Sequence, residues 1–314
     1  MTDYRAINKE NMKDKMKKIV KRIWMERNPI LNSTCHCVGI LYTMWGFLSV
    51  WFSLEGSLPT EWTFWNKLAL ALTVLLVLFV ACFMGCSYWV LRKISNTICT
   101  SNSNHKVIVQ YGDMYSPDVI APGYTERRNI VVNVNRCFDT IVNNNLVSER
   151  TQHGRVMKKL YTQGLYTPNS LNDTIQQNLN QQHAQYEDLT VANKSQGNTY
   201  RYECGTVAEI PGEGNVFYFL LGMSKFDSHF KASTSKEEFC LAIQRLIEFC
   251  NSRSQGYPVI LPLLGSDMAR TNISQTEILS YIVNAFKVNK DKISCDFHIV
   301  IWEGDKDKIS IQYL

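Results

Sequence analysis

Two long stretches without a charged residue constrain this chain more than any other feature. Cys35–Leu54 runs for 20 residues and Leu68–Leu91 for 24 residues without Asp, Glu, Lys or Arg. A helix needs about 20 apolar residues to cross the hydrocarbon core of a bilayer. The short segment between the stretches carries Gly56 and Pro59, which favour a turn. We therefore expect a two-helix transmembrane hairpin over residues 35–94, acting either as an inert anchor or within an active oligomer.

The distribution of charge predicts how this hairpin is oriented. Residues 1–28 hold nine Lys or Arg against four Asp or Glu, and Arg92 and Lys93 follow the second stretch. Basic residues beside a span stay on the cytoplasmic side of the membrane. Both termini and residues 106–314 are therefore expected in the cytoplasm. Those C-terminal residues are close to neutral, which argues against a nucleic-acid partner.

Residues 1–34 form a basic segment with helical periodicity. Apolar side chains recur at helical spacing among its lysines, at Met12, Met16, Ile19 and Ile23. Such a helix either lies on the inner leaflet or is a solvated helix beside the membrane, and the sequence leaves both open. The ten cysteines contain no CxxC pair. They indicate buried thiols in a reducing compartment rather than a metal site or a disulfide framework.

Residues 106–314 alternate between strand-like and helix-like patterns, after an expected polar linker over residues 95–105. The strand-like runs are Lys106–Tyr111, Ile130–Asn135, Tyr200–Ile210, Val216–Met223, Pro258–Leu264 and Phe297–Trp302. Helices are expected at Val156–Gln163 and after the capping boxes that start at Ser235 and Ser274. This alternation predicts a three-layer α/β domain with a mixed sheet. The Asn/Gln-rich residues 168–199 are expected to form an insertion of loop and marginal helix, with little to bury.

Residues able to bind a ligand follow three of these strands. Asp113 follows the first strand, and its carboxylate suits an exocyclic amine such as that of adenine. Asn133, Asn135 and Phe138 lie at the end of the second, where amides suit a sugar and an aromatic ring can stack. A glycine-bearing turn at residues 264–268 follows a later strand, and its exposed N–H groups suit a phosphate. In an open α/β sheet such strand ends meet at one binding edge.

The order of these motifs resembles the macro domain, an α/β fold that binds ADP-ribose. A closer resemblance rests on four stretches, which are Gly112–Tyr115, Asn135–Val142, His153-Gly154 and Pro262–Ser266. Together with the preceding hairpin, they resemble the transmembrane macro-domain effectors of type II Thoeris anti-phage defence systems. The resemblance implies a macro-like mixed sheet over residues 106–314, preceded by the hairpin in the bacterial inner membrane.

The resemblance also implies a function. A partner TIR-domain enzyme consumes NAD and makes an ADP-ribose-type messenger, histidine–ADP-ribose, which the macro domain binds as its ligand, without another cofactor. Binding rearranges a homo-oligomer, and the effector disrupts the lipid bilayer and kills the infected cell. By position, Asp113 would meet the adenine and Asn135 the distal ribose. Leu264, Gly265, Ser266 and Met268 would hold the pyrophosphate, and Phe138, Asp139 and His153 would face the histidine.

Two features qualify this assignment and leave alternatives. Asp267 stands within the expected phosphate loop, where a carboxylate is unfavourable unless it points away or pairs, for example with Arg270. The Gly-rich catalytic loop of ordinary macro domains is absent after Asn135, which favours a non-enzymatic effector. The alternatives are a membrane-tethered ADP-ribosyl hydrolase that uses Asp139 or Glu149, and a membrane-bound reader of ADP-ribosylated proteins.

Overall fold

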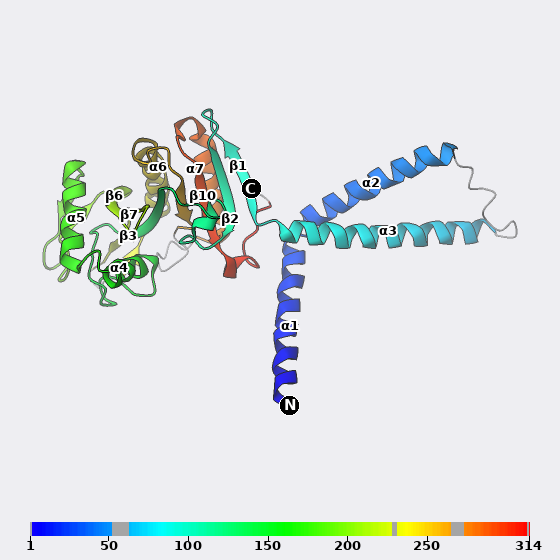
Figure 1. The fold of residues 1–314 in the computed structure, drawn as a ribbon, viewed down its shortest axis with the longest axis horizontal. Helices are drawn as coiled ribbons and strands as arrows, with labels where there is room; N and C mark the ends of the chain where they lie inside the picture. Colours follow the sequence, from blue (N-terminus) through cyan, green and yellow to red (C-terminus); the bar gives the residue numbers. More distant parts are fainter. Residues whose placement is uncertain (1, 52–62, 228–230, 265–272, 313) are drawn as a thin grey trace. The chain divides into compact units, whose positions relative to one another are not determined.

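The chain divides after Ile94 into two structural units (Figure 1). We analysed a computed structural model, which describes residues 2–51, 63–227, 231–264, 273–312 and 314. The first unit is helical, and the second, which begins at Ser95, contains the sheet. Each unit is described by itself below.

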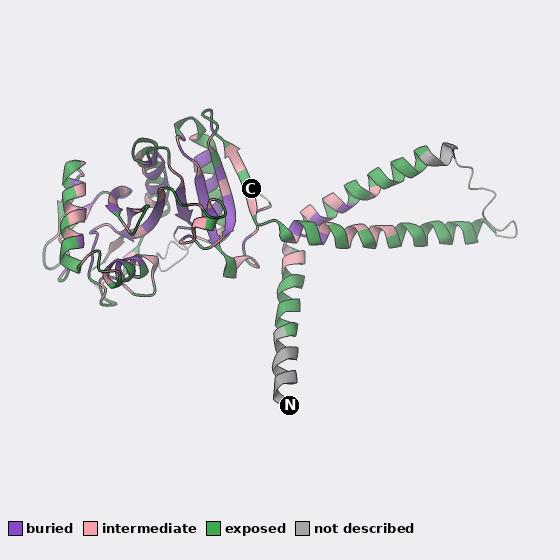
Figure 2. Ribbon diagram, in the orientation of Figure 1, coloured by how far each residue is buried: buried purple, intermediate pink, exposed green. Residues whose placement is uncertain are grey.

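The N-terminal unit consists of α1 (Thr2–Met25), α2 (Arg27–Trp51) and α3 (Phe64–Arg92). Helices α2 and α3 pack against each other, and the thiols of Cys37 and Cys86 lie 3.9 Å apart between them. Helix α3 is 29 residues long, and its most apolar part has a mean hydropathy of 2.8. Its apolar side chains are largely exposed (Figure 2), as expected for a surface that faces lipid.

The predicted hairpin is described only in part. Within the described residues, α3 is the single helix whose length and composition suit a membrane span, and it contains the second predicted stretch, Leu68–Leu91. The first predicted stretch, Cys35–Leu54, lies in α2 up to Trp51 and otherwise outside the described residues. Helix α2 begins at Arg27, inside the segment 1–34 that the sequence analysis set apart. The hairpin therefore stays a prediction.

The second unit is built on a mixed sheet with the strand order β1-β2-β10-β9-β3-β7-β6, where β8 pairs with β7. The strands are β1 (Ser95–Thr100), β2 (Lys106–Gly112), β3 (Arg128–Asn135), β6 (Thr206–Pro211), β7 (Val216–Phe226), β8 (Ala232–Ser233), β9 (Val259–Pro262) and β10 (Phe297–Trp302). The five inner strands from β2 to β7 are parallel, while β1 and β6 pair antiparallel at the edges. A separate ribbon pairs β4 (Tyr186–Asp188) with β5 (Tyr200–Tyr202).

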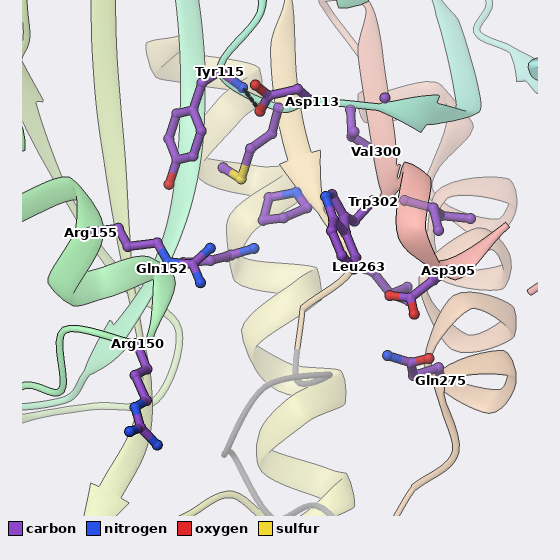
Figure 3. A pocket seen from close by; sticks show the side chains of 14 residues that line it. Asp113, Tyr115, Arg150, Gln152, Arg155, Leu263, Gln275, Val300, Trp302 and Asp305 are labelled. Atoms are coloured by element: carbon purple, nitrogen blue, oxygen red, sulfur yellow. Dashed lines mark hydrogen bonds between the residues drawn. The ribbon is translucent and has the colours of Figure 1, made fainter. Parts of the chain in front are cut away.

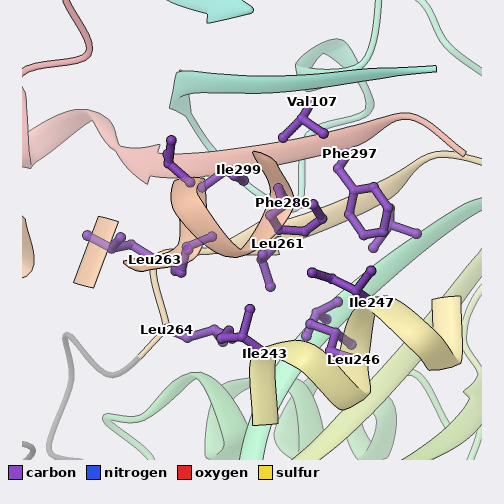
Figure 4. Close-up of a cluster of buried hydrophobic side chains, with 14 of the residues drawn as sticks. Val107, Ile243, Leu246, Ile247, Leu261, Leu263, Leu264, Phe286, Phe297 and Ile299 are labelled. Atoms are coloured by element: carbon purple, nitrogen blue, oxygen red, sulfur yellow. The ribbon is translucent and has the colours of Figure 1, made fainter. Parts of the chain in front are cut away.

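Helices cover both faces of this sheet. The helices are α4 (Gln152–Thr162), α5 (Pro168–Gln181), α6 (Lys236–Arg253) and α7 (Gln275–Val288), with short 3-10 turns at Pro117–Val119, Lys290–Lys292 and Glu303–Asp305. Because side chains alternate along a strand, Val131 joins the core under α6 and α7, while Ile130 and Val132 join the core under α4 and α5. Figure 4 shows the first of these cores. The predicted three-layer α/β fold with a mixed sheet is confirmed.

Two predicted element boundaries are wrong. The segment 95–105, expected as a linker, contains β1, which pairs with β2 and belongs to the second unit. Its polar residues hide a strand because an edge strand needs only a half-buried face. The run Tyr200–Ile210, expected as one strand, is interrupted at Gly205, whose φ of +85° is incompatible with strand backbone.

The Asn/Gln-rich segment also differs from expectation. Helix α5 is 14 residues long, and Thr167 opens it with a capping box that includes Ser170. Its apolar residues Leu171, Ile175 and Leu179 are four residues apart, share one face and are fully buried. Three buried side chains at the right spacing are enough to fix a helix whose remaining surface is polar.

This packing predicts that α5 contributes to the stability of the domain. Ile175→Ala should lower the free energy of unfolding by roughly 2–5 kcal/mol, because it leaves a cavity in a closed core. The matched control is Gln177→Ala on the exposed face of the same helix, which should change stability by less than about 0.5 kcal/mol. Denaturant unfolding of the full chain in detergent micelles measures both. Equal effects of the two variants would contradict the packing of α5.

Candidate functional site

A cleft of about 500 Å³ opens at the edge where the parallel strands end (Figure 3). Strands β2, β10 and β9 are neighbours in the sheet, and their carboxyl ends form one side of the cleft. The start of α4 forms the other side. The lining residues are Gly112, Asp113, Met114, Tyr115, Arg150, Gln152, Arg155, Pro262, Leu263, Gln275, Val300, Ile301, Trp302 and Asp305.

Asp113 lines the cleft immediately beyond β2. One of its carboxylate oxygens accepts a hydrogen bond of 3.0 Å from the Tyr115 backbone N–H, which fixes the turn after the strand. The side chain is exposed to the cleft. The preceding residue, Gly112, lies close to Val119, and a Cβ on Gly112 would be only 3.0 Å from the Val119 side chain. The turn thus holds an acceptor at the cleft wall.

Trp302 is the last residue of β10 and also lines the cleft. Its side chain remains 67% exposed, although the strand before it is buried. In register, Trp302 lies beside Gly112, so the indole stands next to the turn that carries Asp113. An exposed indole at the end of a buried strand offers a stacking surface for a planar ligand.

The α4 side of the cleft carries polar side chains. Arg150 precedes the helix, and Gln152 and Arg155 lie three residues apart on its first turns. Thr151 caps the helix by accepting a hydrogen bond of 3.1 Å from the Gly154 N–H. The cap fixes the direction in which the chain enters α4 and so positions this wall of the cleft.

The predicted site residues at the end of β3 and after it do not line this cleft. They belong to β3 and to the loop that follows it. The Asn135 side-chain oxygen accepts hydrogen bonds from the backbone N–H groups of Cys137 at 3.0 Å and Asp139 at 3.4 Å. These bonds support Phe138 in the left-handed region, with a φ of +52°. The buried Phe138 ring packs edge-on against Tyr202, with ring centroids 5.5 Å apart. The ring therefore contributes to the core.

A buried ion pair ties this loop to the insertion, and we call Asp139, Lys194 and Asn198 the loop clamp. Lys194 donates to both Asp139 carboxylate oxygens at 2.8 and 2.7 Å, and both side chains are at least 98% buried. The Asn198 backbone N–H donates to the same carboxylate at 2.8 Å. Burial raises the pKa of Asp139, and the Lys194 ammonium opposes that rise. The Asn/Gln-rich insertion thus holds the loop after β3 in place.

A glycine makes the close approach in the clamp possible. Gly197 has a φ of +77°, and a Cβ at this position would collide with the Asp139 carboxylate. Asn198 adds a side-chain hydrogen bond of 3.0 Å to the Cys137 carbonyl and one of 2.8 Å to Asn172 of α5. The insertion is therefore bonded to both the loop after β3 and to α5.

His153 lies in the first turn of α4 and is 94% buried. Burial lowers its pKa to about 4, and a hydrogen bond with the Asp139 backbone opposes this shift only in part. Its Nε2 atom is buried without a hydrogen-bond partner. The imidazole is therefore neutral at pH 7.

The structure brings only some of the predicted site residues together. Asp113 lines the cleft, and Leu264 directly follows the lining residue Leu263, with its own side chain in the core. Gly265, Ser266 and Met268, like Asp267 and Arg270, lie outside the described residues. Asn133, Asn135, Phe138, Asp139 and His153 are not among the residues that line the cleft. Their assignment to the ligand stays a prediction.

The sequence analysis missed the residues of the opposite walls. Trp302 ends the apolar run Phe297–Trp302, and Arg150 and Arg155 lie on either side of the capping residue Thr151. Neither feature predicts a cleft residue unless the order of the strands is known, because β10 lies between β2 and β9 in the sheet. Within the described part of the chain, no group of three or more His, Cys, Asp or Glu residues is placed to hold a metal ion.

The fold and the cleft at its strand ends define a macro-type α/β domain. The family model of the macro domain of Thoeris protein ThsA matches residues 107–302, and the chain belongs to this family. The chain is 24% identical over 225 residues to the Thoeris protein ThsA of Bacillus amyloliquefaciens (strain Y2), which covers 70% of each protein. A comparison with the macrodomain of Mycobacterium tuberculosis DarG gives a TM-score of 0.32 at 14% identity, covering 61% of this chain and 96% of that one. The expected Thoeris macro domain is confirmed.

The environment of His153 predicts a pH dependence of stability. In the unfolded chain a histidine takes up a proton near pH 6.5, whereas folded His153 does so only near pH 4. Because the pKa of His153 is lower in the folded chain, neutral His153 contributes fully to the free energy of unfolding above pH 6.5. This contribution is lost as the pH falls toward 4. The free energy of unfolding should therefore fall by up to about 3 kcal/mol across this window.

His153→Gln tests this origin of the pH dependence. Unfolding of the variant, measured between pH 6.5 and 4.5, should show a shallower loss of stability than that of the original chain. His183→Asn is the matched control, because His183 is exposed and has a positive φ that Asn tolerates. If the curves of His153→Gln and the original chain run parallel, His153 is not the titrating group.

Proposed function

We propose that this protein is a membrane effector of bacterial anti-phage defence that is controlled by a nucleotide-derived messenger. A TIR-domain enzyme consumes NAD and supplies an ADP-ribose derivative, histidine–ADP-ribose, which binds in the cleft of the macro domain. Binding rearranges a homo-oligomer of the effector, disrupts the membrane and kills the infected cell. Membership of the Thoeris ThsA macro-domain family supports this proposal.

The observation that carries the proposal is the pairing of Asp113 and Trp302 in one cleft at the carboxyl edge. An adenine has an exocyclic amine that donates hydrogen bonds and a flat ring that stacks. A carboxylate beside an exposed indole matches both properties. The volume of about 500 Å³ is in the range of small-molecule sites.

Binding without turnover is supported by the state of the two carboxylates considered for catalysis. Asp139 is buried in the loop clamp and bonded by Lys194 and Asn198. Glu149 forms an ion pair of 2.5 Å with Lys158. A general base must reach the water that it activates, and both groups are already engaged. This favours an effector over a hydrolase.

The membrane part of the proposal rests on the N-terminal unit. Helix α3 is long and apolar enough to span a bilayer, and α2 packs beside it. We propose that the two form a hairpin in the inner membrane, with both termini and the macro domain in the cytoplasm, because basic residues precede α2 and end α3. The ligand can shift the oligomer only if it binds the two assemblies with different affinities.

The first test concerns the cleft. Asp113→Asn should weaken binding of both ADP-ribose and histidine–ADP-ribose by about tenfold, the value of one buried hydrogen bond. An asparagine oxygen keeps the bond to the Tyr115 N–H, so the turn is preserved. Calorimetry with the full chain in detergent micelles measures the affinities, and Asp173→Asn, an exposed acid of α5, is the matched control. Tight binding that is unaffected by Asp113→Asn would show that the adenine does not bind beside Asp113.

The second test concerns the membrane. Vesicles that contain the full chain and a trapped dye should leak when histidine–ADP-ribose is added. At a concentration that saturates the original chain, the Asp113→Asn variant should leak less, in proportion to its lower occupancy. Ligand binding without leakage would leave the N-terminal unit as an anchor. Catalytic release of ADP-ribose from a modified protein would instead favour the hydrolase alternative.

A further inference from the structure

The α4 wall of the cleft carries positive charge that no acid in the described part of the chain neutralises. Arg150 and Arg155 both line the cleft, and both are exposed. Within the described residues neither guanidinium has an ion-pair partner. The nearest acid in sequence, Glu149, forms an ion pair with Lys158 of α4. The Arg155 guanidinium extends from α4 into the cleft (Figure 3), and Arg150 lies at the edge of the same wall.

The acids that line the cleft lie on the opposite side. Asp113 extends from the end of β2, and Asp305 follows β10 (Figure 3). Asp305 is paired with Lys308 at 2.6 Å, so its charge is compensated. The cleft thus has an acceptor side at the strand ends and a cationic side on α4. In Figure 3, Gln152 and Arg155 extend from α4 toward the side that carries Trp302.

We propose that Arg155, assisted by Arg150 and Gln152, is a specificity-determining residue that binds a carboxylate at the end of the ligand remote from the adenine. This inference rests on the proposed function, because it takes the adenine to lie between Asp113 and Trp302. A guanidinium presents paired N–H donors in a planar fork that matches a carboxylate. Ligands that consist of ADP-ribose joined to an amino acid through its side chain have such a group, whereas ADP-ribose itself does not.

Among the described residues, those that line the strand-end side of the cleft include no cation that could pair with a distal acid. Pro262, Leu263 and Val300 are apolar, and Asp113 would repel a second carboxylate. Of the two described sides, the α4 wall is therefore the one that stabilises an additional negative charge. The predicted preference is for the charge of the terminal group, independent of the ring that carries it.

The test compares two ligands that differ by one carboxylate. The probes are histidine–ADP-ribose and its histamine counterpart, and their affinities for the full chain in detergent micelles are measured by calorimetry. The original chain should bind the carboxylate-bearing ligand at least about tenfold more tightly, since charge-assisted hydrogen bonds are the stronger ones. Arg155→Gln should reduce this ratio to about one. Arg155→Lys should restore part of it, because the charge returns without the fork.

The matched control is Lys158→Gln. It removes one positive charge from the same helix, but Lys158 pairs with Glu149 and does not line the cleft. Its ratio of affinities should equal that of the original chain. The advantage of the carboxylate should also shrink as the salt concentration rises, and this salt dependence should be weaker in Arg155→Gln than in Lys158→Gln.

Each outcome decides between the two proposals. A ratio near one in the original chain, or an unchanged ratio in Arg155→Gln, overturns the carboxylate assignment while adenine binding stands. If Arg155→Gln weakens both ligands equally, the guanidinium binds the shared pyrophosphate, and the assignment is again overturned. If the original chain binds neither conjugate nor ADP-ribose, the proposed function fails, and this inference fails with it.

Discussion

The parallel pairing of the five inner strands is the constraint on which the rest of the domain depends. Parallel strands all present their carboxyl ends at one edge, and β10 lies between β2 and β9 although it is the last strand in the sequence. The register that places Trp302 beside Gly112 therefore joins residues nearly the whole domain apart in sequence. Antiparallel pairing of β10 would place the indole at the other end of the sheet. The cleft is thus a consequence of strand direction, before any single contact is considered.

The loop clamp serves a different purpose from the cleft. A buried ion pair gains little net stability once desolvation is counted, but removing one partner leaves a charge that is costly to bury. Asp139 and Lys194 therefore fix the conformation of the loop after β3 more than they stabilise the fold. That loop leads through Arg150 into α4, which carries Arg155. The insertion 168–199 in this way supports one wall of the cleft without itself lining it.

The sequence was informative wherever one segment determines its own structure. Capping boxes at Ser235 and Ser274 begin α6 and α7 as expected, and the uncharged stretch from Leu68 to Leu91 lies within one helix. Asp113 lines the cleft, as a turn directly after a buried strand favours, while its contact with a ligand stays a prediction. Trp302 and Arg155 were missed because their role depends on which strand lies next to which. The insertion was misjudged because composition does not reveal that three apolar residues share one face.

The close fit inside the loop clamp has a consequence for how related sequences can differ. A cation at 194, an acid at 139 and a glycine at 197 occupy one space, so exchange of any one alone leaves a stranded charge or a steric collision. Substitutions at these three positions are expected to covary across the family. Members that shorten the segment around 194 should carry a neutral residue at the place of Asp139. Such lineages would have to hold the approach to α4 by other means.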